Sequence, residues 1–362
     1  MGLLVTDVLL RDFRSFERLE LALAPGTTIL VGPNAAGKTN TVEAVQLLTS
    51  GASFRRPTPS QLVREGADSA RIDARLEGDG RVIDHRCDVT PTGRRFSRNG
   101  KKCRAVDMPE SLVSVLFSPD DLALVKRGAS VRRDELDFFG RQTSPGYARV
   151  LAEYQRAVEQ RNRLLRDEFP DRSLLDAWDA SVALGGATLL AARLRLFSRL
   201  AEKVSRAYDV IAGGEDLVCA YASSLGEGLE GLGRDELRDV FLERLAQGRE
   251  LDLRRQQTCV GPHRDDVSFL VGGRDARAYA SQGQQRSVVL ALKMAEVELA
   301  GEILGSRPIL LLDDVMSELD ERRRAAVVRF VDEGIQTLIT TTNLGYFSPE
   351  LLDGAKVVSF GE

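Results

Sequence analysis

The stretch that decides the fold reads Thr27-Thr28-Ile29-Leu30-Val31-Gly32-Pro33-Asn34-Ala35-Ala36-Gly37-Lys38-Thr39-Asn40-Thr41. It passes from a β-branched and aliphatic run into a loop bounded by two glycines. Apolar side chains then recur at near-helical spacing, at Val42, Val45 and Leu48. The loop satisfies the pattern G-x-x-x-x-G-K-[ST], which predicts a phosphate-binding loop between a strand and a helix.

Such a loop binds phosphate because its glycines let successive backbone N–H groups face one anion, and the following helix directs its positive end there. We expect a nucleotide, ATP, to be held by Gly32, Pro33, Asn34, Ala35, Ala36, Gly37, Lys38 and Thr39. Lys38 would reach the β- and γ-phosphates, and the Thr39 hydroxyl would bind Mg²⁺. The alternative, a plain strand-to-helix turn, is disfavoured because both flanks fit the motif.

Composition limits the other classes of function. The chain has 362 residues, 43% of them hydrophobic, with a formal net charge of −4. Its four cysteines form no C-x-x-C pair, which argues against a zinc site or a disulfide framework and fits a cytoplasmic protein. We see no apolar run near the roughly 20 residues of a membrane span. The acidic balance restricts any nucleic-acid surface to a local patch.

The order of strand-like and helix-like segments along the chain predicts an α/β fold with an inserted helical lobe. Residues 1–120 alternate like strands around the phosphate-binding loop, and residues 121–253 are mainly helical, with Pro170 between two long helices. Strand-like runs and motifs return in residues 254–362. We therefore expect the first and third segments to form two halves of one ATPase domain with a mixed β-sheet core.

A second motif lies at Ile309-Leu310-Leu311-Leu312-Asp313-Asp314. Four aliphatic residues predict a parallel strand buried on both faces, with two carboxylates at its C-terminal end, where α/β sheets bind ligands. Beside the phosphate-binding loop, Asp313 would complete the Mg²⁺ site with Thr39, and Asp314 would orient or deprotonate the attacking water. Alone, such a strand is often structural.

The third motif is Ser281-Gln282-Gly283-Gln284, at the start of a predicted helix. The first turn of a helix has unpaired N–H groups and a positive dipole end, so Ser281 and Gly283 would form a second anion site. Because the phosphate-binding loop already surrounds one side of the phosphates, this second site would serve a nucleotide held by another copy of the chain. The alternative is a serine N-cap without a ligand.

A basic hairpin completes the candidate sites. It turns at Asn99-Gly100 and carries Arg94, Arg95, Arg98, Lys101 and Lys102 around Phe96. These cations would bind DNA phosphates, or they would only keep an edge strand soluble; the sequence leaves both readings open.

The order of these motifs, followed by Ser317 to Asp320 as a D-loop, resembles the ABC-type ATPase head. Four further stretches resemble the RecF family of bacterial recombination mediators: Arg11 to Arg14, Ser118 to Leu122, Gly261 to Asp265 and Asp313 to Asp320. The chain departs from the head pattern at Asp314, where glutamate is common, at Gln282, and at Thr342 and Asn343, which stand in place of a switch histidine.

The resemblance implies a cytoplasmic, slowly hydrolysing ATPase of DNA repair, recombination and replication that dimerises on binding ATP. It also implies action at single-strand gaps and junctions with RecO and RecR, and contacts of Ser281 and Gly283 with the partner's γ-phosphate. Two other functions stay open, a nucleotide-binding subunit of an ABC transporter and a nucleotide-sensing scaffold with little hydrolysis. The helical insert disfavours the transporter.

Overall fold

The computed structural model describes residues 2–331 and 334–361, which form two compact units. The first unit comprises the residues up to Leu122, Val210–Gly213 and the residues from Val289 onward, and the second comprises Ala123–Asp209 and Gly214–Val288. Residues 254–288 thus group with the helical unit, whereas the sequence pattern placed them in the third segment. The boundaries that the sequence predicts between the ATPase halves and the helical lobe, after residue 120 and after residue 253, stay a prediction.

A parallel sheet forms the centre of the first unit. Its strands lie in the order β14 (Lys356–Ser359), β3 (Thr27–Val31), β13 (Thr337–Thr341), β12 (Ile309–Asp313) and β8 (Ser114–Phe117), and every neighbouring pair is parallel. All five residues of β12 are buried, as their aliphatic run predicts. The sheet places the C-terminal ends of β3, β12 and β13 at one edge.

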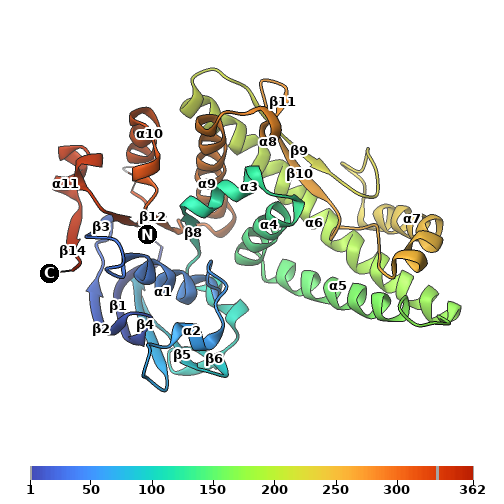
Figure 1. Cartoon of the computed structure of the whole chain (residues 1–362), viewed down its shortest axis with the longest axis horizontal. Helices are drawn as coiled ribbons and strands as arrows, with labels where there is room; N and C mark the ends of the chain where they lie inside the picture. The colour runs from blue at the N-terminus through green and yellow to red at the C-terminus, as the bar shows by residue number, and fades with distance from the viewer. Residues whose placement is uncertain (1, 332–333, 362) are drawn as a thin grey trace. The chain divides into compact units, whose positions relative to one another are not determined.

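Helix α1 (Lys38–Ser50) fills the space between this sheet and a second one (Figure 1). Its apolar side chains share a single core with Leu30 and Leu311 of the parallel sheet and with Ile72 of the antiparallel sheet. Because α1 is covered from two sides, it has no broad polar face. The helix that follows the phosphate-binding loop is therefore fixed on both sides.

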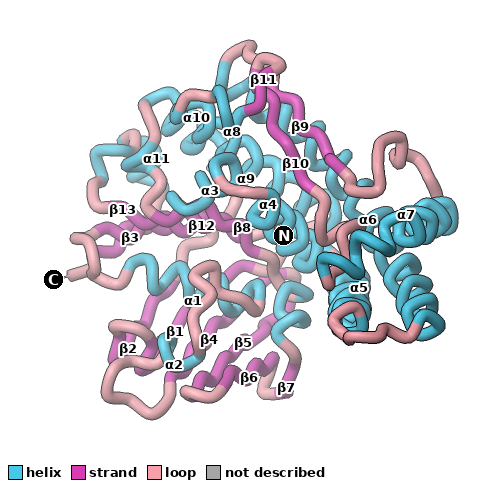
Figure 2. Tube along the Cα trace, turned by 45° about the vertical axis from the view of Figure 1, so that its right-hand side comes forward, coloured by secondary structure: helices cyan, strands magenta, loops and turns pink. Residues whose placement is uncertain are grey.

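The second sheet is antiparallel. Its strand order is β2 (Phe16–Ala22), β1 (Leu4–Phe13), β4 (Ala70–Gly78), β5 (Arg81–Thr90), β6 (Gly93–Arg98) and β7 (Lys101–Cys103) (Figure 2). Alternate residues of β1 and β4 are buried against the core, and the others face away from it. The expected β-content is confirmed, although parallel and antiparallel strands form separate sheets.

Shorter elements complete the first unit. They are α2 (Pro59–Leu62), the 3-10 turns η1 (Ala105–Glu110), η2 (Pro119–Leu122), η3 (Met316–Glu318) and η4 (Leu344–Tyr346), α10 (Glu321–Val331) and α11 (Pro349–Gly354). The sequence predicted that the helix at α10 runs to about Asp332, which lies outside the described residues. The short elements η2, η3 and η4 follow β8, β12 and β13 directly, so they surround one edge of the parallel sheet.

The second unit is mainly helical, as expected. It contains α3 (Ala123–Lys126), α4 (Ala129–Thr143), α5 (Pro145–Leu164), most of α6 (Arg172–Ala212), α7 (Arg234–Arg255), α8 (Ala276–Tyr279) and the start of α9 (Gln282–Leu304). It also holds a small antiparallel sheet of β11 (Arg274–Asp275), β10 (Asp266–Val271) and β9 (Leu217–Ala222). Strand β9 lies inside the segment that was expected from the sequence to be helical.

Helix α6 is the one described helix that is long and apolar enough, by length and composition alone, to cross a membrane. From the sequence we expected no membrane span, and this test of length and composition does not overturn that expectation. The core helix of a soluble protein passes the same test. Arg193, in the middle of α6, is buried and its guanidinium pairs with Asp137 of α4 at 2.7 Å, which fits a helix packed within its unit.

Candidate nucleotide-binding site

The loop between β3 and α1 has the backbone that phosphate binding needs. Gly37, the N-cap of α1, has a φ of 97°, and a Cβ there would lie 2.3 Å from Cζ of Phe16. Gly32 passes so close to Phe360, the residue after β14, that a Cβ would lie 2.3 Å from its carbonyl oxygen. Only glycine fits either position, which explains the two glycines of the motif.

Lys38 folds back over this loop. Its Nζ donates hydrogen bonds of 2.7 Å to the carbonyls of Gly32 and Pro33, and the residue is 6% exposed. Burial lowers the pKa of Lys38, while the negative charges of Asp314 and Asp313 oppose that shift. The predicted phosphate-binding lysine therefore shares one electrostatic environment with the two predicted carboxylates.

Asp313 and Asp314 end β12 at the same edge of the sheet. Asp313 is 5% exposed and accepts a hydrogen bond from the hydroxyl of Thr39, the predicted Mg²⁺ ligand. Burial raises the pKa of Asp313, and the hydrogen bonds from Thr340 and Thr39 oppose the rise. Burial likewise raises the pKa of Asp314, against the charge of Lys38. The structure thus brings together Lys38, Thr39, Asp313 and Asp314.

Asp314 has a backbone conformation that is rare for a residue with a side chain. Its φ is 53°, in the left-handed region, where aspartate is one of the more tolerant residues. Its Oδ1 is buried and has no hydrogen-bond partner among the described residues. Strained backbone and an unsatisfied buried oxygen often mark functional sites.

Thr340 is a member of the site that sequence reasoning missed. It is fully buried at the end of β13, in register with Asp313. Its hydroxyl donates to Oδ1 of Asp313 at 2.7 Å and accepts from the backbone N–H of Asp314 at 2.9 Å. One side chain therefore positions both acids. The neighbouring Thr342 and Asn343, which stand where a switch residue was expected, are exposed.

The donor set fits a hard divalent cation. A hydroxyl from Thr39 and a carboxylate from Asp313 are hydrogen bonded to each other, so both oxygens can face one ion. The unsatisfied Oδ1 of Asp314 adds a further oxygen at the same edge. Among the described residues, no group of three or more His, Cys, Asp or Glu side chains is placed to hold a metal ion.

The third motif lies in the second unit, at the start of α9. Ser281 is exposed, and its Oγ accepts a hydrogen bond of 3.2 Å from the backbone N–H of Gln284. The Gln284 amide in turn accepts from the N–H of Ser281 at 2.8 Å, so the pair caps the helix. The local N-cap is therefore present. The contact of Ser281 and Gly283 with a nucleotide of a second copy stays a prediction.

The cations of the basic hairpin point to different sides of the sheet. The register pairs Arg94 with the buried Val89, and Arg98 with the buried His85 and with Lys101, so Arg94, Arg98 and Lys101 belong to the face that packs on the core, although Arg94 and Lys101 are themselves exposed. Arg95 and Lys102 lie in the alternate, outward rows. Arg98 also pairs with Glu110 at 3.0 Å. The five cations therefore do not form one surface.

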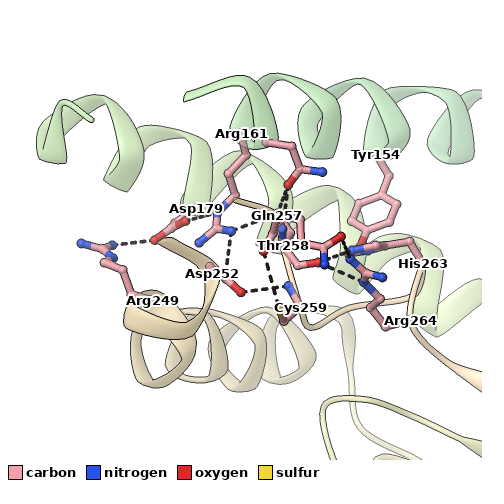
Figure 3. Close-up of polar contacts among 11 residues, drawn as sticks. Tyr154, Arg161, Asp179, Arg249, Asp252, Gln257, Thr258, Cys259, His263 and Arg264 are labelled. Carbon is pink, nitrogen blue, oxygen red and sulfur yellow. Dashed lines mark hydrogen bonds and ion pairs between the residues drawn. The ribbon is translucent and has the colours of Figure 1, made fainter. Parts of the chain in front are cut away.

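The Gly-Pro-His-Arg-Asp stretch is built into the second unit (Figure 3). Tyr154 donates its hydroxyl hydrogen to Nδ1 of His263 at 2.6 Å, because Nε2 must donate to the carbonyl of Thr258 at 3.0 Å. Nearby, the fully buried Arg161 pairs with Asp252 at 2.7 Å. Both imidazole nitrogens are thus engaged internally, which supports a positioning role for His263.

Comparisons with known proteins agree with this geometry. A family model described as the RecF/RecN/SMC N terminal domain matches residues 4–351. The chain is 41% identical over 342 residues to a DNA replication and repair protein RecF from Desulforudis audaxviator, covering 93% of each chain. It is 43% identical over 337 residues to one from Symbiobacterium thermophilum, covering 92% of this chain and 89% of that one.

Comparison with solved structures also finds RecF, together with a more distant head domain. A structure of the recombination mediator protein RecF with ATP, in the RecFOR pathway, matches with a TM-score of 0.89 and 31% identity, covering 96% of this chain and 94% of that one. An Smc head domain from Pyrococcus furiosus matches with a TM-score of 0.58 and 16% identity, covering 99% and 93%. The latter shows the fold alone. The expected α/β fold of an ABC-type ATPase head with an inserted helical lobe is confirmed.

Proposed function

Because the chain belongs to the RecF family of DNA replication and repair proteins, we propose that it binds ATP at the loop between β3 and α1 and acts on DNA. The observation that carries the proposal is the edge of the parallel sheet where Lys38 shares one environment with Asp313 and Asp314. A phosphate loop and two carboxylates at that edge match the needs of nucleotide and metal.

Mg²⁺ would be held by Thr39 and Asp313, and when bound it would neutralise charge on the β- and γ-phosphates. Lys38 would exchange its bonds to the carbonyls of Gly32 and Pro33 for bonds to phosphate oxygens. Thr340 would hold Asp313 in place through its 2.7 Å hydrogen bond.

We propose slow hydrolysis of ATP with Asp314 as the group that orients the attacking water and accepts its proton. Its buried Oδ1 is free to accept a hydrogen bond, and burial raises the pKa of Asp314, which makes it a better base. Its side chain is one methylene shorter than the glutamate of many related heads. The longer reach to water is the reason we expect slow turnover.

The same proposal includes dimerisation driven by ATP. Ser281 is exposed at the start of a helix, so its first turn is open to a ligand from outside the chain. Ser281 and Gly283 would contact the γ-phosphate of a nucleotide held by a second copy. ATP then favours the dimer by linkage, and hydrolysis removes the contact.

In the cell, we propose a cytoplasmic repair protein that acts at single-strand gaps and junctions with RecO and RecR. The support is the family, together with the relative that is described as a mediator in the RecFOR pathway. Membership of this family also disfavours the alternative function, a nucleotide-binding subunit of an ABC transporter.

The decisive experiment measures ATP binding and sedimentation of the purified protein with ATP, with ADP and without nucleotide. We expect dimers with ATP and Mg²⁺ only, and we expect Lys38→Met to abolish both binding and dimerisation. As a matched control, Lys101→Met removes an exposed lysine from the same unit and should change neither. A protein that stays monomeric at saturating ATP and Mg²⁺ would refute the dimer, and one that binds no ATP would refute the proposed function.

A nucleotide-sensing scaffold is the second candidate, and the short, strained Asp314 is the feature that favours it. Turnover separates the two readings. Phosphate release that disappears in Asp313→Asn identifies an ATPase, whereas ATP binding without any release identifies the scaffold.

A further inference from the structure

The outer face of the antiparallel sheet carries a row of arginines that runs across its strands. The register places Arg18 of β2 opposite Arg11 of β1, and Arg11 opposite Arg71 of β4. Arg71 lies opposite Asp88 of β5, and Asp88 opposite Arg95 of β6. We call Arg18, Arg11, Arg71 and Arg95, with Asp88 among them, the arginine row. Figure 2 shows the five strands side by side.

The row faces away from the core. Directly opposed residues share one face of a sheet, and Arg11, Arg18 and Arg95 are exposed. The flanking residues Leu10 and Ile72 point the other way and are fully buried. The sheet therefore presents the four guanidinium groups together on its outer side.

The charges of the row are not balanced within the protein. Arg71 pairs with Asp88 at 2.8 Å, and Arg18 pairs with Glu20 of the next row. Arg11 and Arg95 have no hydrogen-bond or ion-pair partner among the described residues. Arg11 also has an arginine directly opposite on each side, an arrangement that destabilises a sheet. Such repulsion is relieved when an anion binds across the row.

The neighbouring row is different. It runs from Glu20 through Leu9, Asp73, Arg86 and Ser97 to Lys102, so acids and bases are equal in number. Arg86 and Asp73 pair at 2.6 Å. Excess positive charge is thus confined to one line across the sheet.

The length of that line suits a nucleic-acid backbone. Five strands set about 4.8 Å apart span about 19 Å. Over that length each strand of a DNA duplex carries about five or six phosphates. The planar guanidinium group binds phosphate oxygens through two parallel hydrogen bonds, which favours arginine over lysine at such a surface.

We propose that the arginine row is the surface of the first unit that binds the phosphate backbone of DNA. This inference rests on the proposed function, because it locates the DNA contact that the function requires. The proposed DNA surface is a line across five strands and not the whole basic hairpin. Arg95 is the hairpin residue that belongs to this line. The row also lies near the β1–β2 turn, where Phe16 packs against the position of Gly37 in the phosphate loop.

The test compares two double variants of the full chain that change the net charge equally. Arg11→Glu with Arg95→Glu reverses the two unpartnered cations of the row. Arg94→Glu with Lys101→Glu reverses two exposed cations of the same sheet that lie outside the row. Binding of fluorescent gapped duplex DNA is measured by anisotropy with ATP, over a series of salt concentrations. ATP binding by each variant, equal to that of the parent, shows that the fold is kept.

We expect the row variant to bind DNA at least about tenfold more weakly. The slope of its log affinity against log salt concentration should correspond to about two fewer phosphate contacts. The control variant should stay within about twofold of the parent. Equal weakening of both variants, or a larger loss in the control, overturns the proposal, because net charge or the hairpin would then explain binding. If the parent binds ATP but no DNA, the DNA part of the proposed function fails instead.

Discussion

Replacement of Thr340 by valine tests whether one hydroxyl positions both acids of the site. Valine keeps the shape of threonine and removes only the oxygen that donates to Asp313 at 2.7 Å and accepts from the N–H of Asp314 at 2.9 Å. Thr340 is fully buried, so water does not replace the lost oxygen. The Asp314 N–H keeps a weaker bond of 3.3 Å to the carbonyl of Thr340.

The expected loss follows from the charged hydrogen bond. A bond to a carboxylate contributes about 1.5 to 3 kcal/mol, and about 2 kcal/mol corresponds to roughly a 30-fold change in affinity. Loss of an outer partner of a metal ligand costs about 10- to 100-fold, which agrees. We therefore expect Thr340→Val to weaken Mg²⁺-dependent ATP binding about 30-fold, and Thr340→Ser to restore most of it.

The pH dependence separates this role from general damage. The hydrogen bond from Thr340 holds down the pKa of Asp313, which burial raises, so its removal raises that pKa further. A carboxyl must lose its proton to bind metal, so the defect of Thr340→Val should grow as the pH falls from 8 to 6. Titration of ATP binding with Mg²⁺ by calorimetry measures the effect. Binding within twofold of the parent at every pH would refute the reasoning.

Three other predictions concern stability and the loop. Gly37→Ala should abolish ATP binding, measured by calorimetry, because its φ of 97° and the ring of Phe16 leave no room for a methyl group. Burial lowers the pKa of His85 to about 4, against 6.5 when unfolded. The unfolded chain alone therefore binds the proton between these values, and lowering the pH from 7 to 5 should cost about 2 kcal/mol. Burial also lowers the pKa of His263 to about 4, so both proteins should lose stability in urea unfolding, and His85→Gln should lose about 2 kcal/mol less than the parent. Asp252→Ala leaves the buried Arg161 short of one carboxylate and should lower the free energy of unfolding by about 3 to 5 kcal/mol in the same assay, and a loss under about 1 kcal/mol would contradict a buried pair.

The nucleotide site was readable from the sequence because its geometry is local. Gly32, Gly37 and Lys38 act through a loop whose spacing is fixed by the backbone, and the aliphatic run before Asp313 reports a strand buried on both faces. Both signals fall within a dozen residues. The α/β fold follows from them because a phosphate loop needs a strand before it and a helix after it.

The residues that were missed depend on pairing over long distances. Thr340 meets Asp313 only because β12 and β13 are parallel and in one register, and the two residues are 27 positions apart along the chain. Strand β9 pairs with β10 across α7, and its short run at Leu217–Ala222 sits among helical sequence. By contrast, the strict alternation of side chains along β6 is a local signal, and it is enough by itself to place Arg94 and Arg95 on opposite faces.

The chain passes from one unit to the other at four points, and two of these points lie inside continuous helices. The division falls between Asp209 and Val210 within α6, and between Val288 and Val289 within α9. Excision of the helical unit would sever both helices and leave their backbone groups without partners. The helical unit therefore cannot be cut out of the chain as an intact piece. Insertions, deletions and protease cleavage will be tolerated in loops such as the one after α5, and a lineage that lost or replaced the lobe would have had to rebuild α9, which begins at Gln282, as well.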